Sequence, residues 1–406
     1  MFSGNLKSKN TFYSGFEPAT GADWGVLDLV DSLLKSEGPE GLENHIKARF
    51  KARQVLATNL GRTAIFLALK SLGIKEGQKV ALPSIICPTV INMFIVAGIR
   101  PVILDVEDDL HMTSRQIQND KTNFSCVLVP HLYGLSAPID EWENWTNDHG
   151  IKLIDDAAQA VGLSRNGRYL GTFGDAGIFS FGPSKNLGAI RGGALIVRDR
   201  HMDALARSWF MTREPLKYVL RRICSCLLRY QFSIRIKKPT INRHSKDQND
   251  ITANDNSDLR KLPEEAHDHF LLSHVEAGLV CRVLQKMSDI LTVRSKAAKE
   301  LRHTLNGFDH IQNIGDQNAP SRMIPVGIDP RIGAEAAVQY LRNKGIGARR
   351  IYRPLHLKNP KWQQFAPYPL PGAESCWRQV FLLPNPALAG SNYMDRVLQH
   401  ISDLKG

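Results

Sequence analysis

Residues 153–197 read LIDDAAQAVGLSRNGRYLGTFGDAGIFSFGPSKNLGAIRGGALIV. The stretch opens on a short apolar run that ends in two acids, Asp155 and Asp156, and it contains two further apolar runs at residues 176–181 and 193–198. Continuous apolar runs such as ALIV are typical of strands that are buried on both faces, as in parallel sheets covered by helices. The stretch therefore predicts three strands at the centre of an α/β sheet.

The same alternation is present upstream of this stretch. Apolar segments of strand length alternate with segments whose apolar residues recur at helical spacing, and Gly or Pro residues separate them. The expected strands cover residues 54–58, 79–83, 101–106, 126–130 and 152–155, and the expected helices cover residues 61–72, 89–97 and 139–149. This order predicts a mainly parallel, seven-stranded sheet with helices on its faces.

The length of 406 residues is more than a single small core usually serves, so we expect two domains. The expected divisions are an N-terminal arm and helix in residues 1–45, a large sheet domain in 46–212, an insertion with a polar loop in 213–262, and a connecting helix with a smaller α+β domain in 263–406. We expect the connecting helix to begin near Glu264 and to run past Arg294.

The positive charge of the chain is concentrated in one segment. Of the formal net charge of +12, an excess of nine comes from residues 213–246, where ten Lys or Arg residues accompany one acid, Glu214. The rest of the chain is nearly balanced, which argues against a general nucleic-acid-binding surface. Residues 214–232 predict a basic amphipathic helix, which either lies on an anionic membrane or packs over the rest of the protein. We favour packing and keep weak membrane contact through residues 213–246 as the alternative.

Other features of the composition exclude several classes of protein. The first ten residues are polar, so no secretory signal is expected there, and no run approaches the ~18 apolar residues of a membrane span. The cysteines are scattered, which predicts reduced thiols in the cytoplasm rather than a disulfide framework. No His and Cys residues show the spacing of a metal site, so no metal is expected. The six cysteines are Cys87, Cys126, Cys224, Cys226, Cys281 and Cys376.

Three motifs carry candidate chemistry, and each has an ordinary alternative. Asp156 follows a strand and could pair with a cationic ring, or it could cap a helix. Lys185 follows a strand and the breaker Gly-Pro, and it is either a reactive amine or a surface lysine. Gly61 opens a helix in the sequence NLGRT, which either binds phosphate or is an ordinary helix start.

Together the three motifs favour one cofactor. Pyridoxal phosphate requires a lysine for its aldehyde, a carboxylate at its pyridine nitrogen and a cradle for its phosphate. The sequence places all three at the expected ends of strands in one sheet, where ligands of α/β proteins bind. We therefore expect a pyridoxal-phosphate enzyme with the cofactor joined to Lys185 as a Schiff base.

The stretch quoted first resembles the cofactor-binding core of the DegT/DnrJ/EryC1/StrS aminotransferases, which have the aspartate-aminotransferase-like fold of fold type I. The similarity extends over residues 55–199 and resumes at residues 272–294 and in the motifs IYRPLH and FLLPNP. This resemblance implies a large sheet domain with a smaller α+β domain after it. It also implies a homodimer whose active sites lie at the subunit interface.

The resemblance assigns roles to individual residues. Lys185 matches the Schiff-base lysine, and Asp156 matches the acid that pairs with the pyridinium nitrogen. Gln159 matches the residue beside the ring hydroxyl, and Ser180 matches a phosphate ligand. The phosphate-binding turn corresponds to Gly61, Arg62 and Thr63.

The chain departs from the family pattern at several positions. Cys87 stands near the position of the aromatic residue that stacks on the cofactor ring, and Arg62 replaces a residue of the usual Ser-Gly-Thr turn. His269 stands about where relatives carry the asparagine of an Asn-x-Arg motif from the partner subunit. Tyr133 and His356 are the remaining candidates near the substrate, with the alternatives that Tyr133 shapes the sheet edge and that His356 packs against Tyr352.

The resemblance implies an aminotransferase that moves an amino group from an amino acid, with glutamate as the expected donor, to a keto-sugar linked to a nucleotide. Such reactions serve cell-surface polysaccharide or secondary-metabolite biosynthesis. A non-sugar ketone such as a cyclitol is one alternative, and a membrane-surface binding protein on the same fold is another. A nicotinamide enzyme is a weaker alternative, because the glycines of GTFGDAG (residues 171–177) lack the strand–GxGxxG–helix context.

Overall fold

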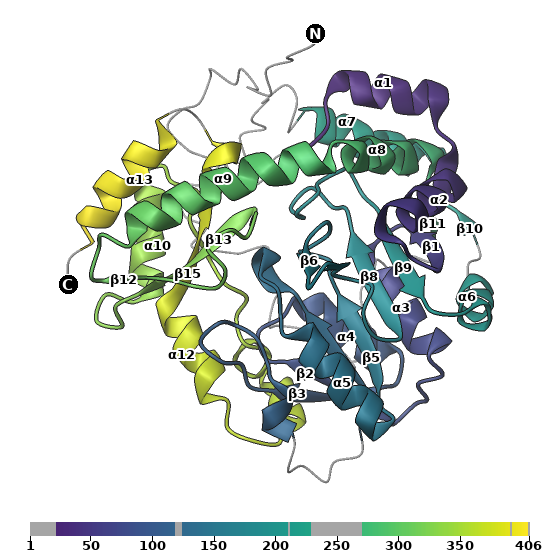
Figure 1. Ribbon diagram of the computed structural model, residues 1–406, viewed down its shortest axis with the longest axis horizontal. Coiled ribbons are helices and arrows are strands. Elements are labelled where there is room, and N and C mark those ends of the chain that lie inside the picture. The colour runs from purple at the N-terminus through teal and green to yellow at the C-terminus, as the bar shows by residue number, and fades with distance from the viewer. Residues whose placement is uncertain (1–21, 118–123, 210–211, 229–269, 390–391, 405–406) are drawn as a thin grey trace.

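A computed structural model of the protein describes residues 22–117, 124–209, 212–228, 270–389 and 392–404. A seven-stranded sheet forms the centre of its larger part (Figure 1). In spatial order the strands are β1 (Gln54–Thr58), β9 (Gly193–Val197), β8 (Ala176–Ser180), β5 (Lys152–Asp156), β4 (Phe124–Pro130), β2 (Lys79–Pro83) and β3 (Arg100–Leu104). Neighbours from β3 to β8 are parallel, and β9 is antiparallel to β8 and to β1. The predicted mainly parallel sheet is therefore confirmed.

Helices cover both faces of this sheet, so each strand sends alternate side chains into two different cores. Leu153 packs into one core and Ile154 into the other, which is why the strand sequences are apolar at nearly every position. One face is covered by α2 (Gly38–Phe50), α5 (Ile139–His149) and α8 (His274–Gln285), and the other by α3 (Gly61–Ser71), α4 (Pro88–Val96) and α6 (Arg200–Arg207).

A smaller antiparallel sheet lies beside the large one, on the left in Figure 1. Its strands are, in spatial order, β12 (Ile311–Asn313), β13 (Met323–Ile328), β15 (Val380–Pro384) and β14 (Arg349–Arg350). A third core joins this sheet to α9 (Met287–Leu305), α10 (Ala334–Asn343) and α13 (Tyr393–Ser402). The seven strands of the large sheet thus lie within residues 46–212, and the small sheet lies within residues 263–406.

The remaining elements are short or peripheral. The paired short strands are β6 (Ser164–Arg165) with β7 (Arg168–Tyr169), and β10 (Thr212–Arg213) with β11 (Phe270–Leu271). The other helices are α1 (Val26–Lys35), α7 (Leu216–Cys226), α11 (Leu355–Lys358) and α12 (Pro371–Gln379), and the 3-10 turns are η1 (Ser114–Ile117), η2 (Leu132–Gly134), η5 (Pro360–Phe365) and η6 (Pro386–Leu388).

The connecting helix differs from its prediction. Residues 264–269 lie outside the described residues, and the next residues form β11 rather than helix. Helix α8 then begins after Ser273, whose hydroxyl accepts a hydrogen bond from the backbone N–H of Glu276 while the Glu276 carboxylate reaches back to Ser273. Lys286 has non-helical backbone angles and separates α8 from α9. The expectation of one continuous helix is therefore wrong.

The basic helix is present over part of the expected range. Helix α7 buries Val219 and Ile223, so its apolar face packs against the large core. Arg222 pairs with Glu214 and with Glu276 of α8, which ties α7 to the large domain. Leu216 remains 68% exposed, so α7 also presents apolar surface to solvent.

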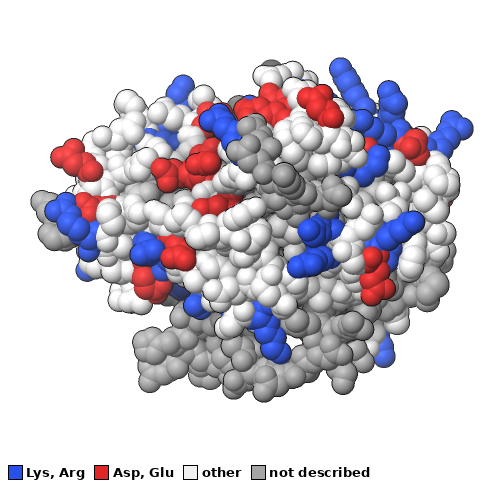
Figure 2. Space-filling view, turned by 90° about the horizontal axis from the view of Figure 1, so that it is seen from below, with Lys and Arg blue, Asp and Glu red and all other residues white. Residues whose placement is uncertain are grey.

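The face drawn in Figure 2 carries side chains of both signs, with several blue ones together at the upper right. Among the described residues, none of the helices combines the length and the apolar character that crossing a membrane requires.

The glycines of residues 171–177 have a packing role. Gly171 has a φ of +84°, and a Cβ on Gly177 would lie 1.8 Å from the Gly171 carbonyl oxygen. These glycines let the loop before β8 pack directly on the strand. The segment leads into a strand and not into a helix, unlike a nicotinamide-binding turn.

Candidate active site

A cavity of about 310 Å³ opens at the carboxyl ends of β4, β5 and β8. This is where parallel sheets bind ligands, because the strands end there and the loops diverge. Seven of the residues predicted from the sequence line this cavity: Gly61, Arg62, Cys87, Asp156, Gln159, Ser180 and Lys185. The structure therefore brings together residues that are up to 124 positions apart in the chain.

The two acids at the end of β5 have different environments, because neighbouring strand residues point to opposite faces. One oxygen of the Asp155 carboxylate accepts a hydrogen bond from His131 Nε2 at 2.7 Å, and the other accepts from the backbone N–H groups of Gly171 and Phe173. His131 Nδ1 accepts from the Ala137 N–H at 3.0 Å, so Nε2 carries the proton that is donated to Asp155. Both carboxylate oxygens of Asp155 thus accept hydrogen bonds from buried groups of the protein.

Asp156 faces the cavity instead. Its Oδ1 accepts a hydrogen bond from the Ala158 N–H at 2.9 Å, and no other described residue donates to its carboxylate. Burial raises the pKa of Asp156, while the Ala158 hydrogen bond and the charge of Lys185 oppose the shift. A buried carboxylate with one free oxygen fits a cationic ring nitrogen, which would stabilise its charge.

The start of α3 and the end of β8 meet at the other side of the cavity. A Cβ on Gly61 would lie 2.9 Å from Ser180 Cβ and 3.1 Å from Ser180 Oγ, so glycine allows the helix start to approach the hydroxyl. The first three N–H groups of a helix have no partner within it, and they bind anions together with the helix dipole. The Thr63 hydroxyl donates to Asn59 Oδ1 at 2.7 Å, and Thr63 does not line the cavity, whereas Arg62 does.

Gln159 is fixed by two tyrosines. Its Oε1 accepts from the Tyr133 N–H at 3.0 Å, so its Nε2 donates to the Tyr352 hydroxyl at 3.2 Å. Tyr133 has a φ of +55°, a strained conformation for a residue with a side chain. Its hydroxyl accepts from the Tyr352 N–H at 2.7 Å, and the two rings stack with centroids 5.7 Å apart. Tyr133 thus acts here on Gln159 and Tyr352 rather than as part of the cavity wall.

Tyr352 is a cavity residue that the sequence reasoning missed. It follows β14, and its hydroxyl lies near the side chain of Cys87, whose sulfur lies 3.2 Å from Thr89 Oγ1. Burial, with Cys87 and Tyr133 nearby, raises the pKa of Tyr352, so the phenol stays protonated. The sequence signal that could have identified Tyr352 is its place in IYRPLH, a motif that resembles the family. Its contact with Cys87 is not visible in the sequence.

The other substrate candidates lie elsewhere or outside the described residues. His356 lies in α11 with Nε2 3.5 Å from Glu374 Oε1, and it does not line the cavity. His269 lies outside the described residues.

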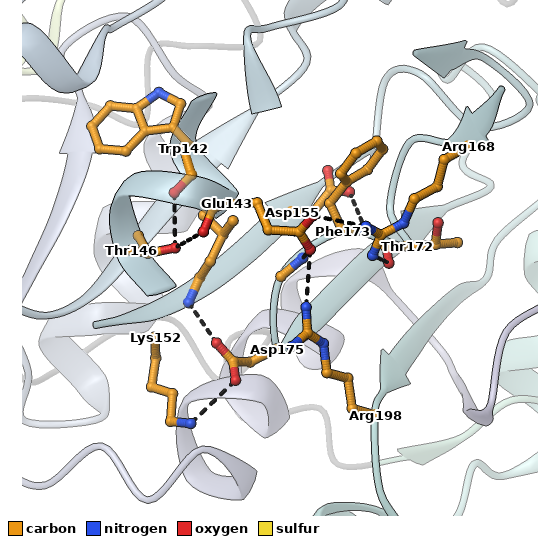
Figure 3. Close-up of polar contacts among 12 residues, drawn as sticks. Trp142, Glu143, Thr146, Lys152, Asp155, Arg168, Thr172, Phe173, Asp175 and Arg198 are labelled. Carbon is orange, nitrogen blue, oxygen red and sulfur yellow. Dashed lines mark hydrogen bonds and ion pairs between the residues drawn. The ribbon is translucent and has the colours of Figure 1, made fainter. Parts of the chain in front are cut away.

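A larger cavity, of about 690 Å³, lies at the opposite end of β8 and contains none of the predicted site residues. Arg168 and Arg198 on its wall both pair with Glu143, and Asp175 pairs with Lys152 (Figure 3). Arg168, Arg198 and Asp175 of its lining are thus engaged in structural pairs. We therefore assign the chemistry to the smaller cavity around Lys185.

The sequence model of the DegT/DnrJ/EryC1/StrS aminotransferase family matches residues 28–402. The chain belongs to this family. The resemblance inferred from the sequence motifs is confirmed, and the match spans both sheets.

Curated relatives of the DegT/DnrJ/EryC1/StrS family support the assignment. The chain is 34% identical over 174 residues to UDP-N-acetyl-3-dehydro-alpha-D-glucosamine 3-aminotransferase of Acidithiobacillus ferrooxidans, covering 42% of this chain and 47% of the relative. It is 33% identical over 207 residues to dTDP-3-amino-3,4,6-trideoxy-alpha-D-glucose transaminase of Micromonospora megalomicea, covering 48% and 55%. The matches therefore span about half the length of these relatives.

The fold of the family is also seen in solved structures. NtdA from Bacillus subtilis, solved with the bound cofactor PMP, superposes with a TM-score of 0.71 at 19% identity, covering 93% of this chain and 81% of that one. At this identity the superposition shows the shared fold. It confirms the predicted fold class.

Proposed function

We propose that the protein is a pyridoxal-phosphate-dependent aminotransferase. The observation that carries the proposal is that Lys185, Asp156 and the Gly61–Ser180 contact converge on one cavity in a chain of this family. The fit is chemical as well as spatial, because Asp156 is buried with a free oxygen and needs a cation.

When bound, pyridoxal phosphate supplies an aldehyde that joins amines and a ring that accepts an electron pair. Asp156 would hold the proton on the ring nitrogen. Ser180, the N–H groups at the start of α3 and the guanidinium of Arg62 would hold the phosphate. Gln159, oriented by Tyr133, would lie beside the ring hydroxyl.

Lys185 would anchor the cofactor and move protons. Its amine would take a proton from the donor α-carbon as general base and would then return that proton as general acid. The same two roles in reverse order would serve the transfer of the amino group to the acceptor ketone.

We propose a nucleotide-linked keto-sugar as the acceptor and glutamate as the donor. The support for the acceptor comes from the two curated relatives, whose names describe transamination of UDP-linked and dTDP-linked sugars, and the donor is the one that the family resemblance implies. The proposal includes a homodimer with shared active sites, as the family resemblance implies. It also includes a weak, secondary contact of residues 213–246 with a membrane surface.

The test combines purified protein and pyridoxal phosphate with ¹⁵N-glutamate and a panel of nucleotide-linked 3-keto and 4-keto sugars. Mass spectrometry should find ¹⁵N in one sugar product. Lys185→Ala should abolish the transfer and the visible absorption of the bound cofactor. Lys152→Ala is the matched control, because Lys152 lies at the opposite end of β5 in an ion pair with Asp175, and it should retain activity. Full turnover by Lys185→Ala would contradict the proposal, and so would transfer to a cyclitol ketone but to none of the sugars.

A further inference from the structure

The loop that carries Lys185 is held by a residue from the N-terminal segment. Asp23 precedes α1, outside the large sheet. Its backbone N–H donates to the Gly188 carbonyl oxygen at 3.0 Å, and its Oδ2 accepts from the Gly188 N–H at 2.6 Å. Asp23 and Gly188 are thus joined in both directions, three residues after the lysine.

Two arginines complete the contact with the same loop. Arg322 Nη1 donates to the Lys185 carbonyl oxygen at 3.1 Å and to Asp23 Oδ2 at 2.9 Å. Arg294 donates to the Asn186 carbonyl oxygen and to Asp23 Oδ1. Each guanidinium therefore bridges the carboxylate of Asp23 and one main-chain carbonyl of the lysine loop.

These three side chains are almost completely removed from solvent. The exposed fractions are 6% for Asp23, 3% for Arg294 and 4% for Arg322. Taking charged groups out of water is costly unless each one is paired and hydrogen-bonded. Removing Asp23 leaves two buried cations without a counter-charge, and removing either arginine leaves one main-chain carbonyl of the loop without that donor, so the arrangement of the whole group depends on all three members.

The three residues come from three different parts of the chain. Arg294 lies in α9, and Arg322 directly precedes β13 of the small sheet. Asn385, at the end of β15, donates from Nδ2 to the carbonyl oxygens of Arg294 and Ser321 at 3.0 and 2.8 Å. The small domain is therefore connected to the main chain of Lys185 by an unbroken set of hydrogen bonds.

We infer that Asp23, Arg294 and Arg322 form a positioning clamp that fixes the main chain at Lys185 and links its placement to that of the small domain. None of the three lines the cavity, so the clamp acts through Lys185 and not on a ligand. Its effect is to keep the lysine amine at the place where the cofactor aldehyde arrives. The inference rests on the proposed function, in which Lys185 binds pyridoxal phosphate.

The test compares three clamp variants with a matched control. Asp23→Asn and Arg322→Met each remove one charge of the clamp, and Arg322→Lys keeps the charge with fewer donors. Lys286→Met is the control. Lys286 lies between α8 and α9 and pairs with Asp28 of α1 at 2.6 Å, so it holds α1 to these helices without contacting the loop that carries Lys185.

Two readouts report on Lys185 and not on folding in general. One is the affinity for pyridoxal phosphate, from titration of the visible absorption. The other is the rate at which borohydride reduction traps the cofactor on the protein, measured by intact mass. Asp23→Asn and Arg322→Met should weaken binding and slow trapping about tenfold or more, because each disrupts a buried hydrogen bond to a charged group. Arg322→Lys should recover part of the loss, and Lys286→Met should match the wild-type protein.

A milder variant keeps the test decisive if the charge changes prevent folding. A Cβ on Gly188 would lie 3.0 Å from the Pro183 carbonyl oxygen and 3.3 Å from both Arg322 Nη1 and Asp23 Oδ2. Gly188→Ala should therefore push the loop against the clamp without removing a charge, and it should slow trapping as well. Trapping rates and affinities within twofold of wild type in Gly188→Ala and in every folded clamp variant would overturn the clamp. A wild-type protein that traps no cofactor would overturn the proposed function itself, and the clamp with it.

Discussion

Replacing Asp155 with asparagine tests the different environments of the two acids at the end of β5. The Asp155 carboxylate accepts three hydrogen bonds, one from His131 and two from the backbone N–H groups of Gly171 and Phe173. An asparagine keeps one acceptor oxygen, which can serve the two N–H groups. Its NH₂ group then faces the His131 Nε2–H, so two donors oppose each other. His131 cannot exchange its proton to the other nitrogen, because Nδ1 already accepts from the Ala137 N–H.

The magnitude follows from this geometry. Asp155→Asn removes one hydrogen bond to a charged group and leaves a buried donor unsatisfied, which costs about 2–4 kcal/mol of unfolding free energy. His131 and Asp155 are both buried, so water does not replace the lost contact. The cavity side of β5 is unchanged, and the affinity for pyridoxal phosphate should stay within about threefold of wild type.

The assay is urea unfolding of the cofactor-free protein at neutral pH, followed by circular dichroism, together with a cofactor titration. Asp156→Asn is the matched comparison, one residue away on the opposite face, and it should lose cofactor affinity rather than stability. The reasoning would be refuted if Asp155→Asn lost less than about 1 kcal/mol, or if it lost cofactor binding while Asp156→Asn retained it.

Three further outcomes are expected. The pKa of Asp156 is raised above its usual value of 3.8, so the folded state binds this proton more tightly than the unfolded state does. The cofactor-free protein should therefore lose stability as the pH rises from 3.8 through the raised pKa. Thermal melts between about pH 4 and 8 should show this fall in the wild type and a smaller fall in Asp156→Asn. Gly61→Ala should weaken binding of pyridoxal phosphate about tenfold in a titration, because the new methyl group displaces Ser180 or the helix start, and unchanged binding would remove the phosphate cradle from the proposal. Ser273→Ala should lower the unfolding free energy by about 1 kcal/mol in urea, since the hydrogen bonds with Glu276 at the start of α8 are lost, and no change would show that this cap is not needed.

Local patterns were sufficient to predict the large sheet. Each strand is buried on both faces, so its sequence is apolar almost throughout and stands out from the helices between. The places of the site motifs at the sheet edge were also predictable, because Asp156 and Ser180 end strands of that sheet and Lys185 lies in the loop that follows Ser180. The helix start at Ser273 had a readable signal, the spacing to Glu276, which sequence reasoning did not use.

Contacts between distant parts of the chain could not be predicted in this way. No periodicity relates Asp23 to Gly188, or Arg322 to Lys185, because these pairs depend on how the N-terminal segment and the small domain meet the large domain. The contact between Tyr352 and Cys87 has the same origin. Sequence patterns report burial along one element, whereas these contacts depend on the packing of several.

Because β9 runs antiparallel to β8, the loop that carries Lys185 could be replaced by the corresponding loop of a relative. Because β8 and β9 are antiparallel neighbours, the loop begins at Ser180 and ends at Gly193, two residues that face each other in the sheet. Connections between parallel strands must cross over from one end of the sheet to the other, usually through a helix, whereas this one returns directly to its own neighbour. In enzyme engineering, residues 181–192 could be transplanted between family members as a single cassette without rethreading the sheet. The graft would have to bring along matching residues at positions 23, 294 and 322, far away in the gene.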